Sequence, residues 1–372
     1  MKLTDLLIVD PIDGSYTGEI IIEGHKIKHI EKTGNDDFEH ILLPGFADTH
    51  THGCIGINSM YMNEKDLKKW EEFLYSQGIT FFLPTTVSAK REDMKRVADL
   101  ISRYKKNNKY TSVGGIHYEG PYINAEKKGA QNPSTIRESS VEELEEVLNE
   151  DVLLVTMAPE TSNFYECSEY LRKKGIVVSL GHSSGSYFDF EKAFEHGTTR
   201  ITHFPNALKG LHHREVGGVG AGFLLPFKLE MILDEFHTSR EFVKLAFKIK
   251  GGDYIFLITD SIDATGLEDG LYDLGGLEVN VIDGKARLKS DNNIAGSTLL
   301  FSDGVRNFFR ITNCSLAELA KVSSYNALKN LNIENKGRIL PDYDADLVLL
   351  SRELQVNKTI KMGKILFKQG GI

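Results

Sequence analysis

Apolar and polar residues follow two different rhythms along this chain. It opens with short apolar runs separated by Asp-Gly and Glu-Gly turns, at Asp5–Asp10, Glu19–Glu23 and Lys26–Ile30. Apolar runs closed by such turns are typical of antiparallel β-strands. We therefore predict a small antiparallel sheet that is complete before Pro44.

From residue 45 onward, apolar runs alternate with stretches of helical period. Leu67, Trp70 and Leu74, for example, recur every three or four positions, the spacing of one helix face. Helices are predicted at Asp66–Gln77, Glu92–Lys105, Val141–Leu148, Tyr165–Lys174, Tyr187–His196 and Ser239–Lys250. After a first strand in the Leu42–Gly53 run, strands are predicted at Ile79–Leu83, Val113–Tyr118, Val152–Met157, Ile176–Leu180, Thr199–Thr202, Phe227–Leu233 and Tyr254–Thr259. Eight strand–helix repeats predict parallel strands with right-handed crossovers, closed into an α/β fold of the (β/α)8 TIM-barrel type.

The C-terminal part returns to β-structure. Two helices are predicted at Leu316–Val322 and Ser324–Leu331, followed by strands at Lys336–Ile339 and Asp346–Leu350 and a hairpin of Lys358–Met362 and Lys364–Lys368 around Gly363. The simplest assembly pairs this tail with the N-terminal strands. We therefore predict a small β-sandwich domain built from residues 1–44 and 336–372, beside a barrel of residues 45–335.

Composition narrows the classes of partner. The 372 residues are 41% apolar and 26% charged, and 44 basic against 53 acidic residues give a net charge of −9. That balance argues against general attraction to nucleic acid or to an anionic membrane, so an anionic ligand needs a local cluster of cations. Neither a signal-peptide pattern nor a run of about 18 apolar residues is present. Cys54, Cys167 and Cys314 are few and far apart, as in proteins of a reducing compartment, and we expect a cytoplasmic protein.

The candidate chemistry begins at His50 and His52. Alternate residues of a strand point to the same face, so these two imidazoles can hold one metal ion, and Gly53 lets the chain bend away beside it. The alternative is a pair of surface histidines on an edge strand.

Other reactive side chains lie at the same end of the predicted strands. They come at or just after the C-terminal ends of apolar runs: Glu119, His182, His203, His237 and Asp260. In a closed barrel these ends converge on one mouth, where barrel enzymes keep their catalytic residues. Each residue alone also fits an ordinary role, as a helix-capping acid or a core histidine. Together they predict a metal-dependent active site.

Several separated blocks resemble one known family. They are Leu43–Gly53 (LPGFADTHTHG), His117–Pro121 (HYEGP), Gly181–Ser183 (GHS), Thr202–Leu208 (THFPNAL), His212–Gly217 (HHREVG), Thr259–Gly266 (TDSIDATG), Gly296–Leu299 (GSTL) and Asp344–Val348 (DADLV). In this order they resemble the N-acetylglucosamine-6-phosphate deacetylases of the amidohydrolase superfamily. A lysine after the fourth strand, which many other amidohydrolases use as a carbamylated bridge, is missing from the VTMAPE run here.

The resemblance implies roles for the metal ligands. Glu119, His182 and His203 correspond to the ligands of a principal divalent ion, and His50 and His52 to those of a second ion that Glu119 can bridge. Imidazole and carboxylate donors suit Zn²⁺ or Fe²⁺, and one or two ions are expected. Asp260 corresponds to the general base that activates water and then protonates the departing amine; its alternative is a helix N-cap.

Substrate contacts are implied in the same way. Arg214 and His237, with His213 as a further candidate, correspond to contacts with a phosphate, together with Asn206 and the backbone of Ala207. In the family the arginine and histidine come from a neighbouring subunit, which implies a homodimer. The alternative is a basic loop that is merely solvated.

Two departures from the family pattern concern sugar recognition. Gln131 stands where many relatives have a histidine that contacts the substrate carbonyl, and glutamine can donate but cannot become cationic. Leu233-Asp234-Glu235 replaces the usual A-D-G before His237.

The expected activity is hydrolysis of the N-acetyl group of N-acetylglucosamine 6-phosphate, in amino-sugar catabolism. Three alternatives stay open: the galactosamine 6-phosphate epimer as substrate, another amidohydrolase reaction such as N-acyl-amino-acid hydrolysis or cyclic amide opening, and a catalytically inactive barrel that serves as a scaffold.

Overall fold

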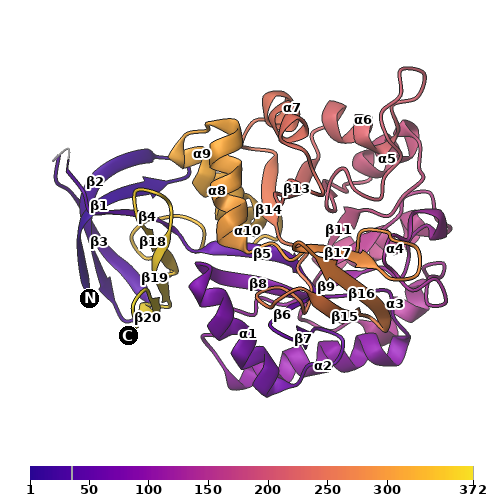
Figure 1. Ribbon diagram of the computed structural model, residues 1–372, viewed down its shortest axis with the longest axis horizontal. Helices are drawn as coiled ribbons and strands as arrows, with labels where there is room; N and C mark the ends of the chain where they lie inside the picture. Colours follow the sequence, from indigo (N-terminus) through magenta and orange to yellow (C-terminus); the bar gives the residue numbers. More distant parts are fainter. Residues whose placement is uncertain (35–36, 372) are drawn as a thin grey trace.

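The computed structural model describes residues 1–34 and 37–371. It confirms the predicted fold class, a barrel of eight parallel strands next to a sheet from both ends of the chain (Figure 1). The barrel strands are β5 (Phe46–Thr51), β8 (Ile79–Thr86), β9 (Ile116–Glu119), β10 (Val152–Met157), β11 (Val177–Leu180), β12 (Arg200–Ile201), β13 (Lys228–Ile232) and β14 (Ile255–Ile258). Their backbones are buried on both faces, as expected for parallel strands covered by helices.

Contacts at the mouth join the first strand to the last. The backbone N–H of Asp260 donates to the carbonyl of His50 (2.9 Å), and Thr51 forms a parallel bridge with Ser261. Below them the Asp48 carboxylate accepts from the Thr259 hydroxyl (2.6 Å). This junction places residues 210 positions apart in sequence on one rim.

Helices cover the outside of the barrel. They are α1 (Glu64–Ser76), α2 (Arg91–Asn107), α3 (Val141–Val147), α4 (Phe164–Lys173), α5 (Tyr187–Glu195), α6 (Gly217–Leu224), α7 (Arg240–Lys250) and α8 (Phe301–Thr312). Six of them match the predicted helices. The helices α6 and α8 were not predicted, and α6 is rich in glycine, which weakens any helical signal. No helix in the described part of the chain is both long and apolar enough to cross a bilayer.

The segment after α8 differs from the two separate helices predicted there. It is one continuous helical run of α9 (Leu316–Ala320), a π-helical turn (Lys321–Tyr325) and α10 (Asn326–Asn330). The Ser323 hydroxyl donates back to the Leu319 carbonyl (2.7 Å) inside this run. Such hydroxyl bonds are a common cause of local distortion in helices.

Strands from both termini form the second sheet. They are β1 (Lys2–Asp10), β2 (Gly14–Glu23), β3 (Lys26–Lys32), β4 (His40–Pro44), β18 (Leu347–Leu350), β19 (Val356–Lys361) and β20 (Lys364–Lys368), in the order β20-β19-β18-β4-β1-β2-β3. Both ends of the chain lie in this lobe (Figure 1). Its separate core includes Leu6 and Ile8 from the start of the chain and Leu347 and Ile360 from the end. The division of the domains at residues 44/45 and 335/336 stays a prediction.

One predicted strand of this lobe is wrong. Residues 336–339 form no strand, because the Ile339 N–H donates to the Asp10 carboxylate (2.9 Å) and Arg338 pairs with the same group (2.8 Å). The following strand begins at Leu347, and the C-terminal hairpin is confirmed as β19 and β20, which pair antiparallel.

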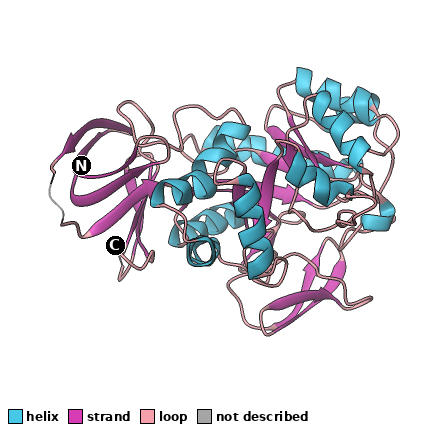
Figure 2. Cartoon of the chain, turned by 90° about the horizontal axis from the view of Figure 1, so that it is seen from above, coloured by secondary structure: helices cyan, strands magenta, loops and turns pink. Residues whose placement is uncertain are grey.

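A three-stranded antiparallel sheet between β14 and α8 was also not predicted. It comprises β15 (Gly270–Leu274), β16 (Leu277–Ile282) and β17 (Lys285–Leu288). Figure 2 shows it projecting as a separate ribbon beside the barrel. Leu274, the last residue of β15, and Ile294 and Gly296 in the segment after β17 line the cavity described below.

A buried ion network ties the terminal sheet to the barrel, and it yields a stability prediction. Lys361, 3% exposed, donates to the barrel carbonyl of Thr80 (2.8 Å) and pairs with Asp346 (2.9 Å). Lys361→Met removes one of two cations from the buried Asp346, which keeps Lys336 as a partner (2.5 Å). It also takes a donor from the Thr80 carbonyl, so it should lower the free energy of unfolding by about 1–3 kcal/mol. Chemical denaturation measures this loss. The exposed Lys289–Glu278 pair is the control, and Lys289→Met should cost less than about 1 kcal/mol; equal losses would contradict the prediction.

Candidate active site and metal centre

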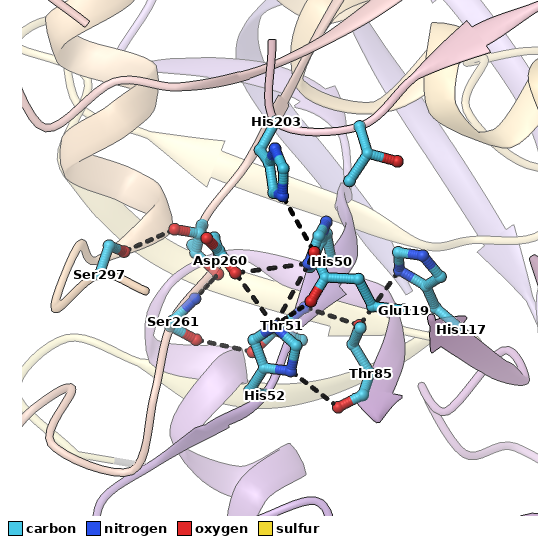
Figure 3. A network of polar contacts seen from close by, with 12 residues as sticks. His50, Thr51, His52, Thr85, His117, Glu119, His203, Asp260, Ser261 and Ser297 are labelled. Carbon is cyan, nitrogen blue, oxygen red and sulfur yellow. Dashed lines mark hydrogen bonds and ion pairs between the residues drawn. The ribbon is translucent and has the colours of Figure 1, made fainter. Parts of the chain in front are cut away.

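Two groups of potential metal ligands face each other at the mouth of the barrel. One is His50, His52 and Asp260; the other is Glu119, His182 and His203. All six side chains are buried, and Figure 3 shows the imidazoles of His50, His52 and His203 around Glu119. The structure therefore brings together the six residues that the sequence predicted as metal ligands and general base.

The backbone explains why these side chains turn inward. His50 and His52 alternate on β5, and Glu119 is the last residue of β9. His182, His203 and Asp260 each follow a strand end by two residues and have positive φ values of 47°, 30° and 51°. For non-glycine residues this conformation is uncommon and costly, and it concentrates at functional sites.

The Glu119 carboxylate lies between the two groups. Its Oε1 is 3.0 Å from His182 Nε2, 3.0 Å from His203 Nε2 and 3.3 Å from His50 Nε2. Its Oε2 is 3.2 Å from His52 Nε2. One carboxylate thus touches both groups.

The other ring nitrogens fix the tautomers of three histidines. Each Nδ1 faces an oxygen that only accepts hydrogen bonds: Glu230 Oε2 for His50 (3.0 Å), the Thr85 carbonyl for His52 (3.0 Å) and the Lys127 carbonyl for His182 (2.8 Å). Each Nδ1 must therefore carry the proton, which leaves the Nε2 lone pair directed into the site. His203 Nδ1 has no hydrogen-bond partner among the described residues.

The donor set fits a divalent cation. Nε2 atoms face one another at 3.1 Å between His182 and His203 and at 3.3 Å between His50 and His52. Two lone pairs at that separation repel unless a proton or a cation lies between them. Imidazole nitrogen and carboxylate oxygen are the ligands that suit Zn²⁺ and Fe²⁺, and metal-ligating histidines usually donate the second ring N–H to an oxygen, as here.

Charge in the site also favours a cation. Burial raises the pKa of Glu119, but the neighbouring His50 and His182 outweigh it and hold the pKa well below its usual range. Burial lowers the pKa of His52, but hydrogen bonds to Asp260 and Glu119 outweigh it and raise the pKa to about 9. Ionised carboxylates therefore attract positive charge, and a bound metal ion would displace protons from the imidazoles.

A cavity of about 380 Å³ opens above the two groups. Besides ligand residues, its lining includes four of the predicted substrate-binding residues, Gln131, Asn206, Ala207 and His237. The other two, His213 and Arg214, lie on an exposed loop, where the Arg214 guanidinium contacts the His213 ring (2.9 Å). The cavity of one chain therefore lacks the predicted arginine.

Gln131 makes contacts that the sequence did not predict. Its side-chain NH₂ donates to Glu119 Oε2 (2.6 Å), and its Oε1 accepts from the Ser88 N–H (2.6 Å). These two partners fix the direction of the amide. Gln131 supports a predicted metal ligand and also lines the cavity.

Three buried charged residues close to the site were missed by sequence reasoning. Asp48 accepts from the His50 N–H (3.2 Å), and burial raises its pKa to about 7 despite the hydrogen bond from Thr259. Glu230 and Arg200 form an ion pair (2.6 Å) in the barrel interior. The available signal was a charged residue within an apolar strand, KLEMI in the case of Glu230, because such a residue must be paired when buried.

Comparison with known proteins shows the family to which the chain belongs. The model of the amidohydrolase family matches residues 41–366. The chain belongs to the amidohydrolase family. Among its relatives, the N-acetylglucosamine-6-phosphate deacetylase of Lysinibacillus sphaericus is 35% identical over 91% of this chain and 89% of the relative. The N-acetylgalactosamine-6-phosphate deacetylase of Escherichia coli O157:H7 is 32% identical over 87% of each chain.

A solved amidohydrolase structure extends the likeness to the whole fold. The N-acetylglucosamine-6-phosphate deacetylase of Thermotoga maritima is 48% identical, with a TM-score of 0.96 over 99% of this chain and all of the other. The resemblance that the sequence blocks predicted is thereby confirmed.

The central place of Glu119 predicts an order of metal loss among variants of this amidohydrolase. Glu119→Gln changes a carboxylate that touches both groups, whereas His52→Ala removes a donor from one group only. Glu119→Gln should therefore bind less Zn²⁺ than His52→Ala, as measured by elemental analysis after equilibration with limiting metal. Glu126→Gln, on the cavity lining, should keep the wild-type content. Equal contents in all three variants would show that Glu119 is not a ligand.

Proposed function

We propose that this protein hydrolyses the N-acetyl group of N-acetylglucosamine 6-phosphate to glucosamine 6-phosphate and acetate. The observation that carries the proposal is the convergence of four imidazoles on Glu119, with Asp260 beside them, at the base of a cavity of sugar-phosphate size. The relatives that act on phosphorylated N-acetylhexosamines, by name, support the substrate class.

The donor groups hold one or two divalent ions in this proposal, with Zn²⁺ or Fe²⁺ as the candidates. Glu119, His182 and His203 form the principal set, and His50 and His52 the second. When bound, such an ion polarises a carbonyl oxygen and lowers the pKa of water.

Asp260 moves the proton in this scheme. Its Oδ1 lies 3.1 Å from His52 Nε2 and 3.3 Å from His50 Nε2, and its positive φ turns the carboxylate toward the cavity. Burial raises the pKa of Asp260, but His50 and His52 outweigh it and lower the pKa, so the group is ionised and can accept a proton. It takes a proton from the attacking water as that oxygen bonds to the acetyl carbon. It then returns the proton to the amine nitrogen as the C–N bond breaks, releasing acetate.

Phosphate binding requires cations, and one chain offers few of them in the cavity. His237 and Lys127 contribute to the lining, and the His237 Nδ1 contacts Asp234 (2.6 Å). The resemblance implied that Arg214 and His237 both come from a neighbouring subunit, but His237 lines the cavity of its own chain. We therefore place Arg214 and His213 of a second copy at the same phosphate, in a homodimer. Exposed apolar side chains around their loop support an interface there, with Leu211 60%, Leu224 68% and Phe188 73% exposed.

The gluco epimer is favoured, because an N-acetylglucosamine-6-phosphate deacetylase is 48% identical to this chain, whereas the N-acetylgalactosamine-6-phosphate deacetylase is 32% identical. The intact donor set argues against a scaffold without activity, and the phosphate-binding candidates argue against other amidohydrolase reactions. The negative net charge and the three free, buried cysteines support a cytoplasmic location.

Acetate release from a panel of N-acetylated hexosamines tests the activity. The metal-loaded protein should release acetate from a 6-phosphorylated N-acetylhexosamine much faster than from the unphosphorylated sugar. Asp260→Asn should lower kcat by about 100- to 10,000-fold, the usual share of general acid–base catalysis, while its metal content stays close to wild type. A metal-replete wild-type protein that releases no acetate from either phosphorylated epimer would refute the proposed function. Near wild-type kcat in Asp260→Asn would remove only the role of Asp260.

Mixing two impaired variants, assayed at a substrate concentration well below the KM of Arg214→Ala, tests the shared site. Arg214→Ala should raise KM more for the phosphorylated sugar than for the unphosphorylated one. In a hybrid dimer of Arg214→Ala and Asp260→Asn chains, one of the two sites receives both native residues if Arg214 acts across the interface. Random reassociation should then restore up to about one quarter of wild-type activity. No restoration, with hybrid dimers demonstrated, would show that Arg214 acts within its own chain or not at all.

A further inference from the structure

We propose that Glu230 is a positioning residue that sets both groups of metal ligands at once, and that Arg200 holds it in place. This inference rests on the metal site of the proposed function and concerns residues outside that site. Glu230 lies on β13 and Arg200 on β12, and both are fully buried.

The Glu230 carboxylate accepts three hydrogen bonds and forms an ion pair with Arg200. Its Oε2 accepts from His50 Nδ1 (3.0 Å) and from the backbone N–H of His203 (3.1 Å). Its Oε1 accepts from Arg200 Nε (2.7 Å) and forms an ion pair with Arg200 Nη2 (2.6 Å). Each oxygen of the carboxylate therefore has its own fixed partners, His50 and His203 on Oε2 and Arg200 on Oε1, and these partners hold the group in one orientation.

The two hydrogen bonds that Glu230 Oε2 accepts reach one histidine from each ligand group. The bond to Nδ1 orients the His50 ring and fixes the tautomer whose Nε2 lone pair points at the cation. The bond to the His203 N–H holds a backbone with φ of 30°, which is unfavourable for this residue without support. A change at Glu230 should therefore disturb both groups, although its carboxylate is not a ligand in either of them.

Arg200 is fixed from three further sides. Its guanidinium donates to the Thr49 hydroxyl (2.6 Å) and to the Asn330 side-chain oxygen (3.2 Å), and it lies over the Phe256 ring at 4.5 Å. Thr49 is the neighbour of His50 on β5. The ion pair thus joins the first, sixth and seventh strands of the barrel beneath the mouth.

A buried ion pair is often replaceable by apolar residues of similar volume without loss of stability. Such a replacement separates the two roles that Glu230 could have. If the pair only fills and stabilises the barrel, an apolar pair should leave cation binding unchanged. If Glu230 positions the histidines, cation binding should weaken in a folded protein.

The experiment compares Zn²⁺ affinity in wild type, Glu230→Gln and the double variant Glu230→Leu/Arg200→Met. Affinity is measured by competition with a chromogenic chelator on metal-free protein, and folding by circular dichroism and the melting temperature of the same samples. Loss of a residue that hydrogen-bonds to a metal ligand typically lowers metal affinity by about 10- to 100-fold, and we expect that loss in both variants. The matched control is Lys361→Met/Asp346→Leu, which removes a buried pair between the terminal sheet and the barrel, leaves Lys336 paired with Asp344 (2.8 Å), and should bind Zn²⁺ as wild type does.

Several outcomes are decisive. Wild-type Zn²⁺ affinity and stoichiometry in a folded Glu230→Gln or double variant would overturn the proposal. So would an equal loss of affinity in the Lys361→Met/Asp346→Leu control, because the effect would then be general destabilisation. Wild-type protein that binds Zn²⁺ but releases no acetate would refute the deacetylase activity and leave the positioning role standing, whereas wild-type protein that binds no divalent cation would overturn both.

Discussion

Electrostatic repulsion among convergent lone pairs is the constraint on which this structure depends. Parallel strands direct their C-terminal residues to one rim, and here that rim carries four imidazoles and two carboxylates within hydrogen-bond distance of one another. Neutral imidazoles whose outer nitrogens are already protonated can only present lone pairs to Glu119. A divalent cation would satisfy all of these groups together, whereas a proton can bridge only two of them at a time.

Buried charged residues in the barrel interior beneath the rim hold the rim residues in position. Glu230 offsets Arg200 and orients His50 and His203, while Asp48 joins the first strand to Thr259 on the last. Buried charges are costly unless they are paired and fully hydrogen-bonded. Their presence inside an otherwise apolar barrel therefore indicates that the geometry of the rim, rather than stability alone, determines these positions.

Much of the fold and the site could be predicted because both follow local periodicity. Once a barrel is assumed, the sequence alone shows that His50 and His52 alternate on one strand. It also shows which reactive side chains follow strand ends: Glu119, His182, His203 and Asp260. The partners of Glu230 lie 27, 30 and 180 positions away, and no local pattern encodes such pairs.

Two further differences have the same origin. The 336–339 segment resembles a strand, but Asp10, more than 300 residues earlier, takes its hydrogen bonds. The contacts of Gln131 with Glu119 and Ser88, which determine the orientation of its amide, were not predicted either.

Anomalous X-ray diffraction from crystals of the Zn²⁺-loaded, active protein tests the central claim most directly. The account predicts an anomalous peak bonded to Glu119 and to the Nε2 atoms of His182 and His203, at about 2.0–2.2 Å from each. A protein that releases acetate while its zinc lies outside the reach of Glu119 would contradict the account.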